Sequence, residues 1–474
     1  MKAFASCCAL ALAACLLAAC AILPGTAQPT WEELLAEVNA EHQSIRRGEI
    51  DPTPYLRTSI TEEEGLKVWD YVRAQGEDFD PDRQLTRAEA EEDVAWLFDA
   101  LYYSYAFYDY LGGPAVFDAA ESAVQQELEG KDSLTARELQ DLLIGHLGFI
   151  KDGHFNINGV QTACRKAPFF FRQVAFVPTE DGWRTVGGRT VESVDGHEDL
   201  DELFKRSISR QGDLVYYPVL LEDVAFDMQS EFQQHACSEK LTVRYADGSS
   251  QTLTAEPWSV YVSDLPDGER TELRQAGGVP VFQFNNFVST WRRALMDGAN
   301  ALADAPAGIL DLRSNTGGME DMADSWLLRY SGQTVPSNGL RSFVINGQTA
   351  GLAGYTVPDG WVENDRVLIV LTGKRTASCA ELLLERTANL ENVLVIGENT
   401  SGAMMSNACR MQLPHSGCQV TMTVDSVHQP SADSRYEELR GYEPDIWVPA
   451  AEAEELAVKL MENLGASAAP QGQP

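Results

Sequence analysis

The string Gly308-Ile309-Leu310-Asp311-Leu312-Arg313-Ser314-Asn315-Thr316-Gly317-Gly318 joins an apolar run of strand length to a polar loop with paired glycines. Short apolar runs bounded by turn residues are typical of buried strands. The same pattern recurs along the chain, with strands predicted at 279–284, 308–312, 367–371 and 393–396 and helices from Thr290, Met319 and Ser378. Alternating strands and helices predict an α/β layered domain, which we place at residues 278–462.

Two segments with different sequence patterns precede this domain. Residues 31–150 have helical periodicity and contain Thr-x-x-Glu capping boxes, which mark helix starts, at Thr61/Glu64, Thr86/Glu89 and Thr135/Glu138. We therefore predict a helical N-terminal domain at 31–150. Residues 164–258 consist of short β-like runs separated by glycine turns, which predicts a small β-rich module. The Ala/Pro/Gln-rich tail at 465–474 is expected to be disordered.

The first residues predict an export signal. Lys2 precedes an apolar run that is too short to span a bilayer and ends in Leu-Ala-Ala-Cys20. This ending resembles the bacterial lipobox, so residues 1–19 are predicted to be a lipoprotein signal peptide, Cys20 the lipidated residue and 20–30 a tether. The alternative is a secretory signal cut near Ala27. We expect an exported protein that is lipid-anchored to the outer face of the bacterial cell membrane, with no other membrane contact.

The composition and the absence of certain motifs argue against several classes of function. The formal net charge is −35 over 474 residues, so the surface repels phosphate backbones and a nucleic-acid partner is not expected. Of the nine cysteines, the two that flank the 414–417 turn, Cys409 and Cys418, are the expected disulfide pair in an oxidising compartment. Because the chain has no CxxC, HExxH, P-loop or GxGxxG string, neither a metal nor a cofactor is expected.

Three strings carry candidate chemistry. Ser378 starts a helix after a strand, where unpaired N–H groups and the positive end of the helix dipole favour a developing oxyanion. The same serine opens a Ser-x-x-Glu capping box, so it is either a nucleophile or a helix cap. The glycines Gly317 and Gly318 allow close backbone approach, or form an ordinary turn. His154, in an Asp-Gly-His loop, is either a base or a surface histidine.

Together these strings resemble those of the tail-specific, or C-terminal-processing, serine peptidase family, in particular its branch with the tricorn core and the retinoid-binding-protein repeats. Four strings of that family stand here in order: DLRSNTGG at 311–318, TASCAE at 376–381, GENTSG at 397–402 and GYEPDI at 441–446. The resemblance covers residues 278–450 well and the helical N-terminal part only vaguely.

The resemblance implies a crotonase-like ββα spiral for the catalytic domain and Ser378 as its nucleophile. The processing-protease branch carries a lysine directly after the GExTxG string, where this chain has Ala403. The tricorn-like branch instead uses a histidine oriented by a glutamate, and those positions hold His154 and Glu438. Glu437 is the substitute for Glu438, because Gly153 replaces the serine that links the two groups in the tricorn core.

The expected oxyanion hole consists of the N–H groups of Cys379 and of Gly317 or Gly318. In relatives, the position of the 164–258 module often holds a PDZ-like domain, but this chain has no clear GLGF loop, so binding of substrate C-termini is left open. His415 and His428 are rival bases, and His428 is the stronger rival because it is nearer Glu438 in sequence.

The predicted function is an exported serine endopeptidase with a Ser-His-Glu site acting on polypeptide substrates. The alternative is a catalytically inactive, surface-tethered binding protein on the same scaffold, because a fold does not guarantee activity.

Overall fold

The computed structural model describes residues 28–466 except 46–49, 74–77, 226–232, 264, 266–269, 349–359 and 406. The predicted signal peptide, Cys20, most of the tether and the tail beyond residue 466 lie outside the described residues. Within the described ranges, no helix is long and apolar enough to cross a membrane.

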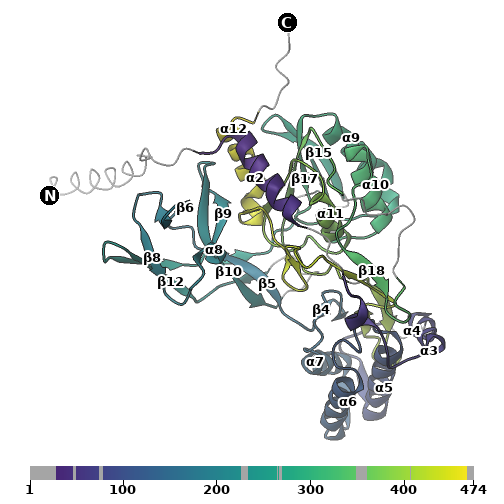
Figure 1. The fold of residues 1–474 in the computed structure, drawn as a ribbon. Helices are drawn as coiled ribbons and strands as arrows, with labels where there is room; N and C mark the ends of the chain where they lie inside the picture. Colours follow the sequence, from purple (N-terminus) through teal and green to yellow (C-terminus); the bar gives the residue numbers. More distant parts are fainter. Residues whose placement is uncertain are drawn as a thin grey trace, which may run out of the picture.

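A six-stranded sheet forms the centre of the predicted α/β domain (Figure 1). The first two strands pair antiparallel and the others pair in parallel. The strand order is β15 (Thr271–Ala276), β16 (Val279–Phe284), β17 (Ala307–Asp311), β19 (Val367–Thr372), β20 (Val393–Gly397) and β26 (Ile446–Trp447). The four strands predicted from apolar runs are confirmed to within one residue at each end, because fully buried parallel strands are apolar on both faces.

Both faces of the sheet are covered by helices. Along β19, Leu368 and Val370 join one core, whereas Ile369 and Leu371 join the other, as the two-residue period of a strand requires. The first core is closed by α9 (Arg292–Ala303), α10 (Glu320–Ser331) and α11 (Cys379–Thr387), and the second by α2 (Trp31–Ser44) and α12 (Ala453–Leu464).

The position of α2 corrects the predicted boundary of the helical domain. The sequence pattern places residues 31–44 in the helical domain, but Trp31, Leu34 and Val38 pack against the central sheet beside α12 (Figure 1). An amphipathic helix buries its apolar stripe against whichever surface the fold presents, and the local pattern does not specify that surface.

The remaining helices form a separate bundle with their own core. Three strands from the C-terminal part of the chain pack against this bundle: β21 (Cys409–Gln412), β22 (Gln419–Met422) and β23 (Ser426–Gln429). Their side chains Met411, Val420 and Val427 belong to its core. The three predicted capping boxes are present, since each threonine accepts from the N–H of its glutamate and the glutamate accepts from the threonine N–H. The helices are α3 (Glu62–Gly65), α4 (Val68–Arg73), α5 (Arg87–Ser104), α6 (Pro114–Glu129) and α7 (Ala136–His146).

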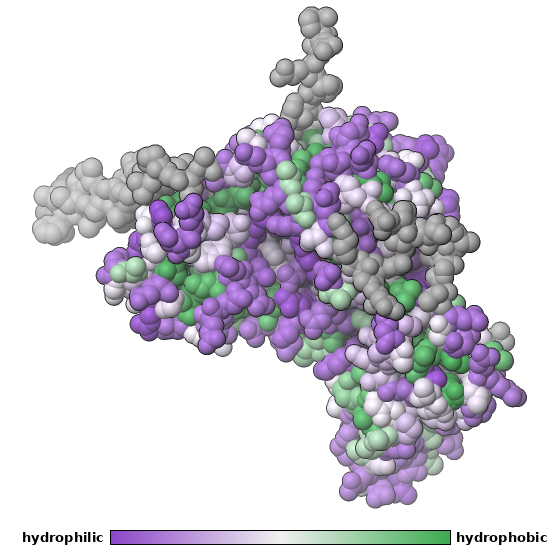
Figure 2. Space-filling model, viewed as in Figure 1, coloured by the Kyte–Doolittle hydropathy of each residue, from purple (hydrophilic) through white to green (hydrophobic). Residues whose placement is uncertain are grey.

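The β-rich module has its own small core of aromatic and aliphatic side chains. Its strands are β5 (Arg165–Phe170), β6 (Phe176–Thr179), β7 (Gly182–Thr185), β8 (Val191–Val194), β9 (Phe204–Ile208), β10 (Leu214–Val224), β11 (Gln234–His235), β12 (Lys240–Tyr245), β13 (Ser250–Thr254) and β14 (Trp258–Ser259), with the short α8 (Leu200–Leu203). Figure 2 shows hydrophilic residues over most of one face of the molecule, in keeping with the strongly acidic composition.

Candidate active site

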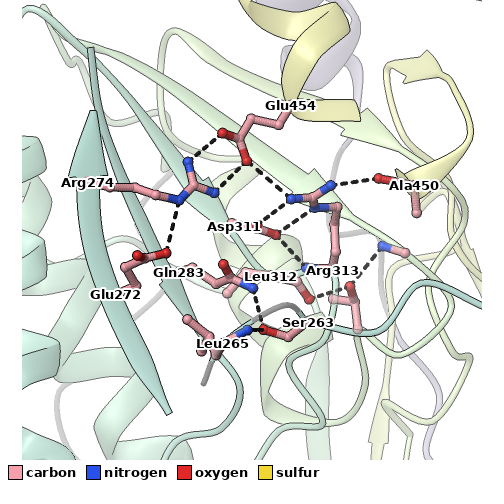
Figure 3. A network of polar contacts seen from close by, with 12 residues as sticks. Ser263, Leu265, Glu272, Arg274, Gln283, Asp311, Leu312, Arg313, Ala450 and Glu454 are labelled. Atoms are coloured by element: carbon pink, nitrogen blue, oxygen red, sulfur yellow. Dashed lines mark hydrogen bonds and ion pairs between the residues drawn. The ribbon is translucent and has the colours of Figure 1, made fainter. Parts of the chain in front are cut away.

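The DLRSNTGG string is anchored at its start by a buried ion pair (Figure 3). Arg313 donates through Nε and Nη2 to the carboxylate of Asp311, at 2.9 and 2.7 Å, and through Nη1 to Ala450 O at 2.8 Å. The same guanidinium lies 3.3 Å from Glu454 and over the ring of Tyr261. These contacts fix the direction in which the chain leaves β17 toward the glycines.

Two glycines then bring the backbone against Ser378. Gly317 and Gly318 have φ of +90° and +133°, a region that side chains rarely adopt. A Cβ on Gly317 would lie 2.6 Å from Ser378 Cβ, and one on Gly318 would collide with the carbonyl of Phe287. Glycine is therefore required at both positions for the loop to lie against the start of α11.

The backbone of Ser378 differs from that of the ordinary helix caps in this chain. Thr30, Thr61, Thr86 and Thr135 are N-cap residues with extended backbone, φ between −68° and −88°. Ser378 has φ +55° and ψ −121°, although Glu381 accepts from its N–H at 3.0 Å as a capping box requires. A non-glycine residue held in such a region costs on the order of 1–3 kcal/mol, and such strain clusters at functional sites.

His154 lies in a loop that packs on the GENTSG string. A Cβ on Gly153 would collide with Gly402 O and would lie 2.7 Å from Ala403 Cα, so the two backbones are in direct contact. His154 N donates to Asp152 Oδ1 at 2.9 Å, and Gly153 N donates to Glu438 Oε1 at 2.8 Å. The histidine loop thus reaches Ala403, the position of the lysine in the processing-protease branch.

Glu438 is held by backbone and phenol groups. Besides Gly153 N, its carboxylate accepts from Met405 N at 3.3 Å and from the Tyr436 hydroxyl. Glu437, the predicted substitute, has a side chain that is 70% exposed and lies 3.7 Å from Arg440. Glu438 is therefore the residue of this pair that contacts the histidine loop, and it does so through the N–H of Gly153.

Burial sets the protonation of these two groups. It lowers the pKa of His154 to about 4; nearby Asp152 opposes this shift and Arg165 adds to it. Burial, reinforced by Asp152, raises the pKa of Glu438 to about 8. At neutral pH the imidazole is neutral, which is the form that accepts a proton.

Three buried residues join these loops: Glu381, which is the glutamate of the Ser378 capping box, and Arg165 and Lys374, which no sequence pattern marks. Glu381 accepts from Thr400 Oγ1, Gly402 N and Ala403 N as well as from Ser378 N. Arg165 donates to Gly153 O and to Ser401, and Lys374 donates to Thr400 O. No local pattern marks these roles, because each depends on loops distant in sequence.

The rival histidines have other partners. His428 is buried and its Nε2 lies 3.0 Å from Glu385 Oε2, while His415 is 2.8 Å from the exposed Glu92. Each imidazole is therefore engaged in an ion pair or hydrogen bond of its own.

The backbone donors near Ser378 are not equivalent. Gly317 N donates to Asn315 Oδ1 at 2.9 Å and so completes the turn of its own loop. Among the described residues, no hydrogen-bond acceptor is assigned to the N–H of Gly318 or of Cys379.

The predicted disulfide is wrong in this structure. Cys409 and Cys418 lie in the expected hairpin, but both thiols are free. Cys409 pairs with Met422 across the hairpin, whereas Cys418 lies at the turn end, where its carbonyl accepts from Leu413 N. The register therefore separates two residues that the sequence alone places on either side of a turn.

A cavity of about 640 Å³ lies beside Glu438, between the 437–440 loop and the β-rich module. Leu203, Val219 and Leu439 contribute apolar lining, and Lys166, Lys205 and Arg440 are among the charged lining residues. Ser378 and His154 do not line it, so this cavity adjoins the loop of Glu438 rather than the nucleophile.

Residues 277–448 match the model of peptidase family S41. The solved structures to which this chain is similar include mature CPAF, 14% identical, with 80% of this chain and 96% of that chain covered and a TM-score of 0.42. The photosystem II D1 C-terminal processing protease is 13% identical, with 80% and 98% covered and a TM-score of 0.37. The tricorn protease is 13% identical, with 79% and 37% covered and a TM-score of 0.31.

The matched segment contains both glycines, Ser378 and every strand of the central sheet except β15, and it indicates a serine-type peptidase. Through residues 277–448 the chain is similar to peptidase family S41, the tail-specific proteases.

Proposed function

We propose that this protein is an exported serine endopeptidase in which Ser378 is the nucleophile, His154 the general base and Glu438 the residue that orients the base. The observation that carries the proposal is the strained backbone of Ser378, which lies against Gly317 at the start of α11. A residue that only capped the helix would have the extended backbone of the four threonine caps.

Acylation of Ser378 requires one proton to move twice, and water then releases the acyl group with the same base taking its proton. His154 takes the hydroxyl proton of Ser378 as the oxygen attacks a peptide carbonyl, and then delivers it to the leaving amine. The N–H groups of Gly318 and Cys379 hold the oxyanion, each contributing about 2.7–4 kcal/mol by analogy with other enzymes. Glu438 supports the base by fixing the N–H of Gly153 and so the backbone that carries the imidazole.

The architecture and location belong to the same proposal. We assign the 278–462 domain to the crotonase-like ββα spiral and the 164–258 module to a PDZ-like unit, and we keep Cys20 as a lipidated N-terminus. Two acyl chains meet the two-signal requirement for stable anchoring. Mass spectrometry of the mature N-terminus checks the anchor, because an unmodified start near residue 28 contradicts it.

A fluorophosphonate probe separates catalysis from mere binding. We expect the wild-type protein to be labelled at Ser378 and to cleave members of a peptide library, and Ser378→Ala to do neither. His154→Ala should lose nearly as much activity, and the double variant should be scarcely worse, because members of one catalytic unit are not additive. An unlabelled wild type that cleaves no peptide would identify the inactive binding protein instead.

A further inference from the structure

A buried lysine lies four residues before the nucleophile. Lys374 belongs to the loop between β19 and α11, and it is 1% exposed. Its Nζ donates to Thr400 O at 2.6 Å and to Arg440 O at 3.0 Å. Both acceptors are backbone carbonyls from loops distant in sequence.

This arrangement is unlike that of an ordinary buried ion pair. Lysine is almost never fully buried unless it is paired with a carboxylate, because desolvating an ammonium group is costly. Within the part of the chain that the structure describes, no carboxylate forms an ion pair with Lys374, although Glu381 and Glu398 face it along with Arg165 and Arg440. The buried amine instead donates hydrogen bonds to two backbone carbonyls, those of Thr400 and Arg440.

Those carbonyls belong to the two loops that complete the site. Thr400 lies in the GENTSG string, on which Gly153 packs. Arg440 follows Glu438 by two residues in the loop whose Leu439 N donates to Gly402 O at 2.9 Å. The amine thus joins the loop of Ser378 to the two loops that complete the site, and the bond from Ser401 N to Thr376 O at 2.8 Å links two of the same segments.

We propose that Lys374 is a positioning residue for hydrolysis: its two hydrogen bonds set the distance between the loop of Ser378 and the loops that carry Glu438 and His154. The proposal rests on the peptidase function proposed above. Burial and the nearby Arg165 also lower the pKa of Lys374 well below its usual value, and both the neutral and the charged amine can donate to two carbonyls.

The test compares two substitutions of Lys374 with a matched control. Lys374→Met keeps the length of the side chain and removes the donors, whereas Lys374→Gln keeps an amide donor. The control is Asn389→Ala, which removes another buried donor to a backbone carbonyl, Asn389 Nδ2 to Pro336 O at 2.8 Å, without touching the three loops. Peptide hydrolysis is measured across pH, together with hydrogen–deuterium exchange of the 400–403 and 439–440 amides.

For Lys374→Met we expect kcat to fall about 100-fold with KM little changed, because misplacement of catalytic groups acts on the chemical step. Hydrogen–deuterium exchange of the 400–403 and 439–440 amides should become faster. The acid limb of the pH profile of the remaining activity should not move, and Lys374→Gln should recover part of the lost kcat. Asn389→Ala should match wild type in kcat at a comparable loss of stability.

Three results would overturn the inference. Equal kcat in Lys374→Met and Asn389→Ala would show that Lys374 only stabilises the fold. Loss of the acid pH limb in Lys374→Met would make the lysine the base itself. A wild type that neither reacts with fluorophosphonate nor cleaves peptides would remove the proposed function and the positioning role with it, whereas the first two results leave Ser378 as nucleophile.

Discussion

The backbone conformation of Ser378 differs from that of an ordinary helix cap, although both occur in the same capping-box motif. Ser-x-x-Glu opens a helix at Ser378 just as Thr-x-x-Glu does at Thr135, and both capping glutamates accept from the cap N–H. Of these two cap residues, Ser378 has a positive φ and Thr135 does not. The capping box therefore holds the serine in place, while the strained backbone turns it toward the glycine loop.

This difference predicts opposite effects for two alanine substitutions. Thr135→Ala should lower the free energy of unfolding by about 1 kcal/mol, because the threonine side chain accepts from Glu138 N, and leave hydrolysis intact. Ser378→Ala should abolish hydrolysis and change stability less. Urea denaturation and peptide hydrolysis measure both; an active, strongly destabilised Ser378→Ala would mean that Ser378 is only a cap.

The lowered pKa of His154 leads to a prediction of how activity and stability depend on pH. Its pKa is lowered to about 4 by burial, whereas an exposed histidine titrates near 6.5. Between about pH 6.5 and 4, His154 is therefore protonated in the unfolded chain but neutral in the native protein. Its contribution lowers the free energy of unfolding as pH falls through that window. Activity that depends on the neutral imidazole should persist below pH 6.5 and fall toward about pH 4.

The profile of His154→Gln is the control for that prediction. Its free energy of unfolding should lose less between pH 6.5 and 4 than that of the wild type, since the buried imidazole is gone. A wild-type acid limb of kcat/KM near pH 8 would instead report the ionisation of Glu438, whose pKa is raised to about 8.

At the scale of elements, the histidine loop depends on a contact between two backbones. Gly153 leaves no room for a Cβ against Gly402 O and Ala403, whereas Gly145 in α7 has no atom within 4 Å of that position. Gly153→Ala should thus displace the loop and reduce kcat by about 100-fold. Gly145→Ala should preserve kcat and stabilise α7 by about 0.5–1 kcal/mol; equal kcat in the two variants would refute the packing requirement.

The hairpin β21–β22 gives a second prediction at this scale. Because Cys409 opposes Met422, its thiol and that of Cys418 should both remain free in secreted protein. Alkylation of denatured, unreduced protein followed by mass spectrometry should modify both. Detection of a peptide that links Cys409 to Cys418 would show that the hairpin register differs from the one described here.

At the scale of the whole molecule, α2 is fastened to the central sheet by a buried cluster. His42 Nε2 lies 2.9 Å from Asp445 Oδ1, Arg435 Nη1 lies 2.5 Å from the same oxygen, and Val395 N donates to Oδ2 at 2.7 Å. His42, Arg435 and these hydrogen bonds lower the pKa of Asp445 despite its burial. Stability from this carboxylate is present above its usual pKa near 3.9 and is lost as pH falls below it.

Asp445→Asn should accordingly cost about 3–5 kcal/mol, because it leaves buried charges without their partner. Asp297→Asn, in an exposed pair with Arg293, should change the free energy of unfolding by less than about 0.5 kcal/mol. Denaturant titration measures both. Equal stabilities would mean that the α2 contact contributes little to the fold.

Local sequence patterns were sufficient to predict the parts of this protein that depend on local chemistry. Continuous apolar runs predicted the four strands 279–284, 308–312, 367–371 and 393–396, because a strand buried on both faces cannot be polar on either. The capping boxes predicted helix starts, since the bonds involved join residues three apart. The strings around Ser378, Gly317 and His154 predicted the candidate site for the same reason, as each is contiguous.

Tertiary structure alone decided how those pieces meet. The docking of α2 on the sheet, the register that keeps Cys409 from Cys418 and the burial of Lys374 between Thr400 and Arg440 all join residues distant in sequence. Hydrophobic burial is non-directional and a polar group accepts any partner of suitable geometry, so a local pattern shows that a contact is needed but does not name the partner. That choice is made only when the whole chain is packed.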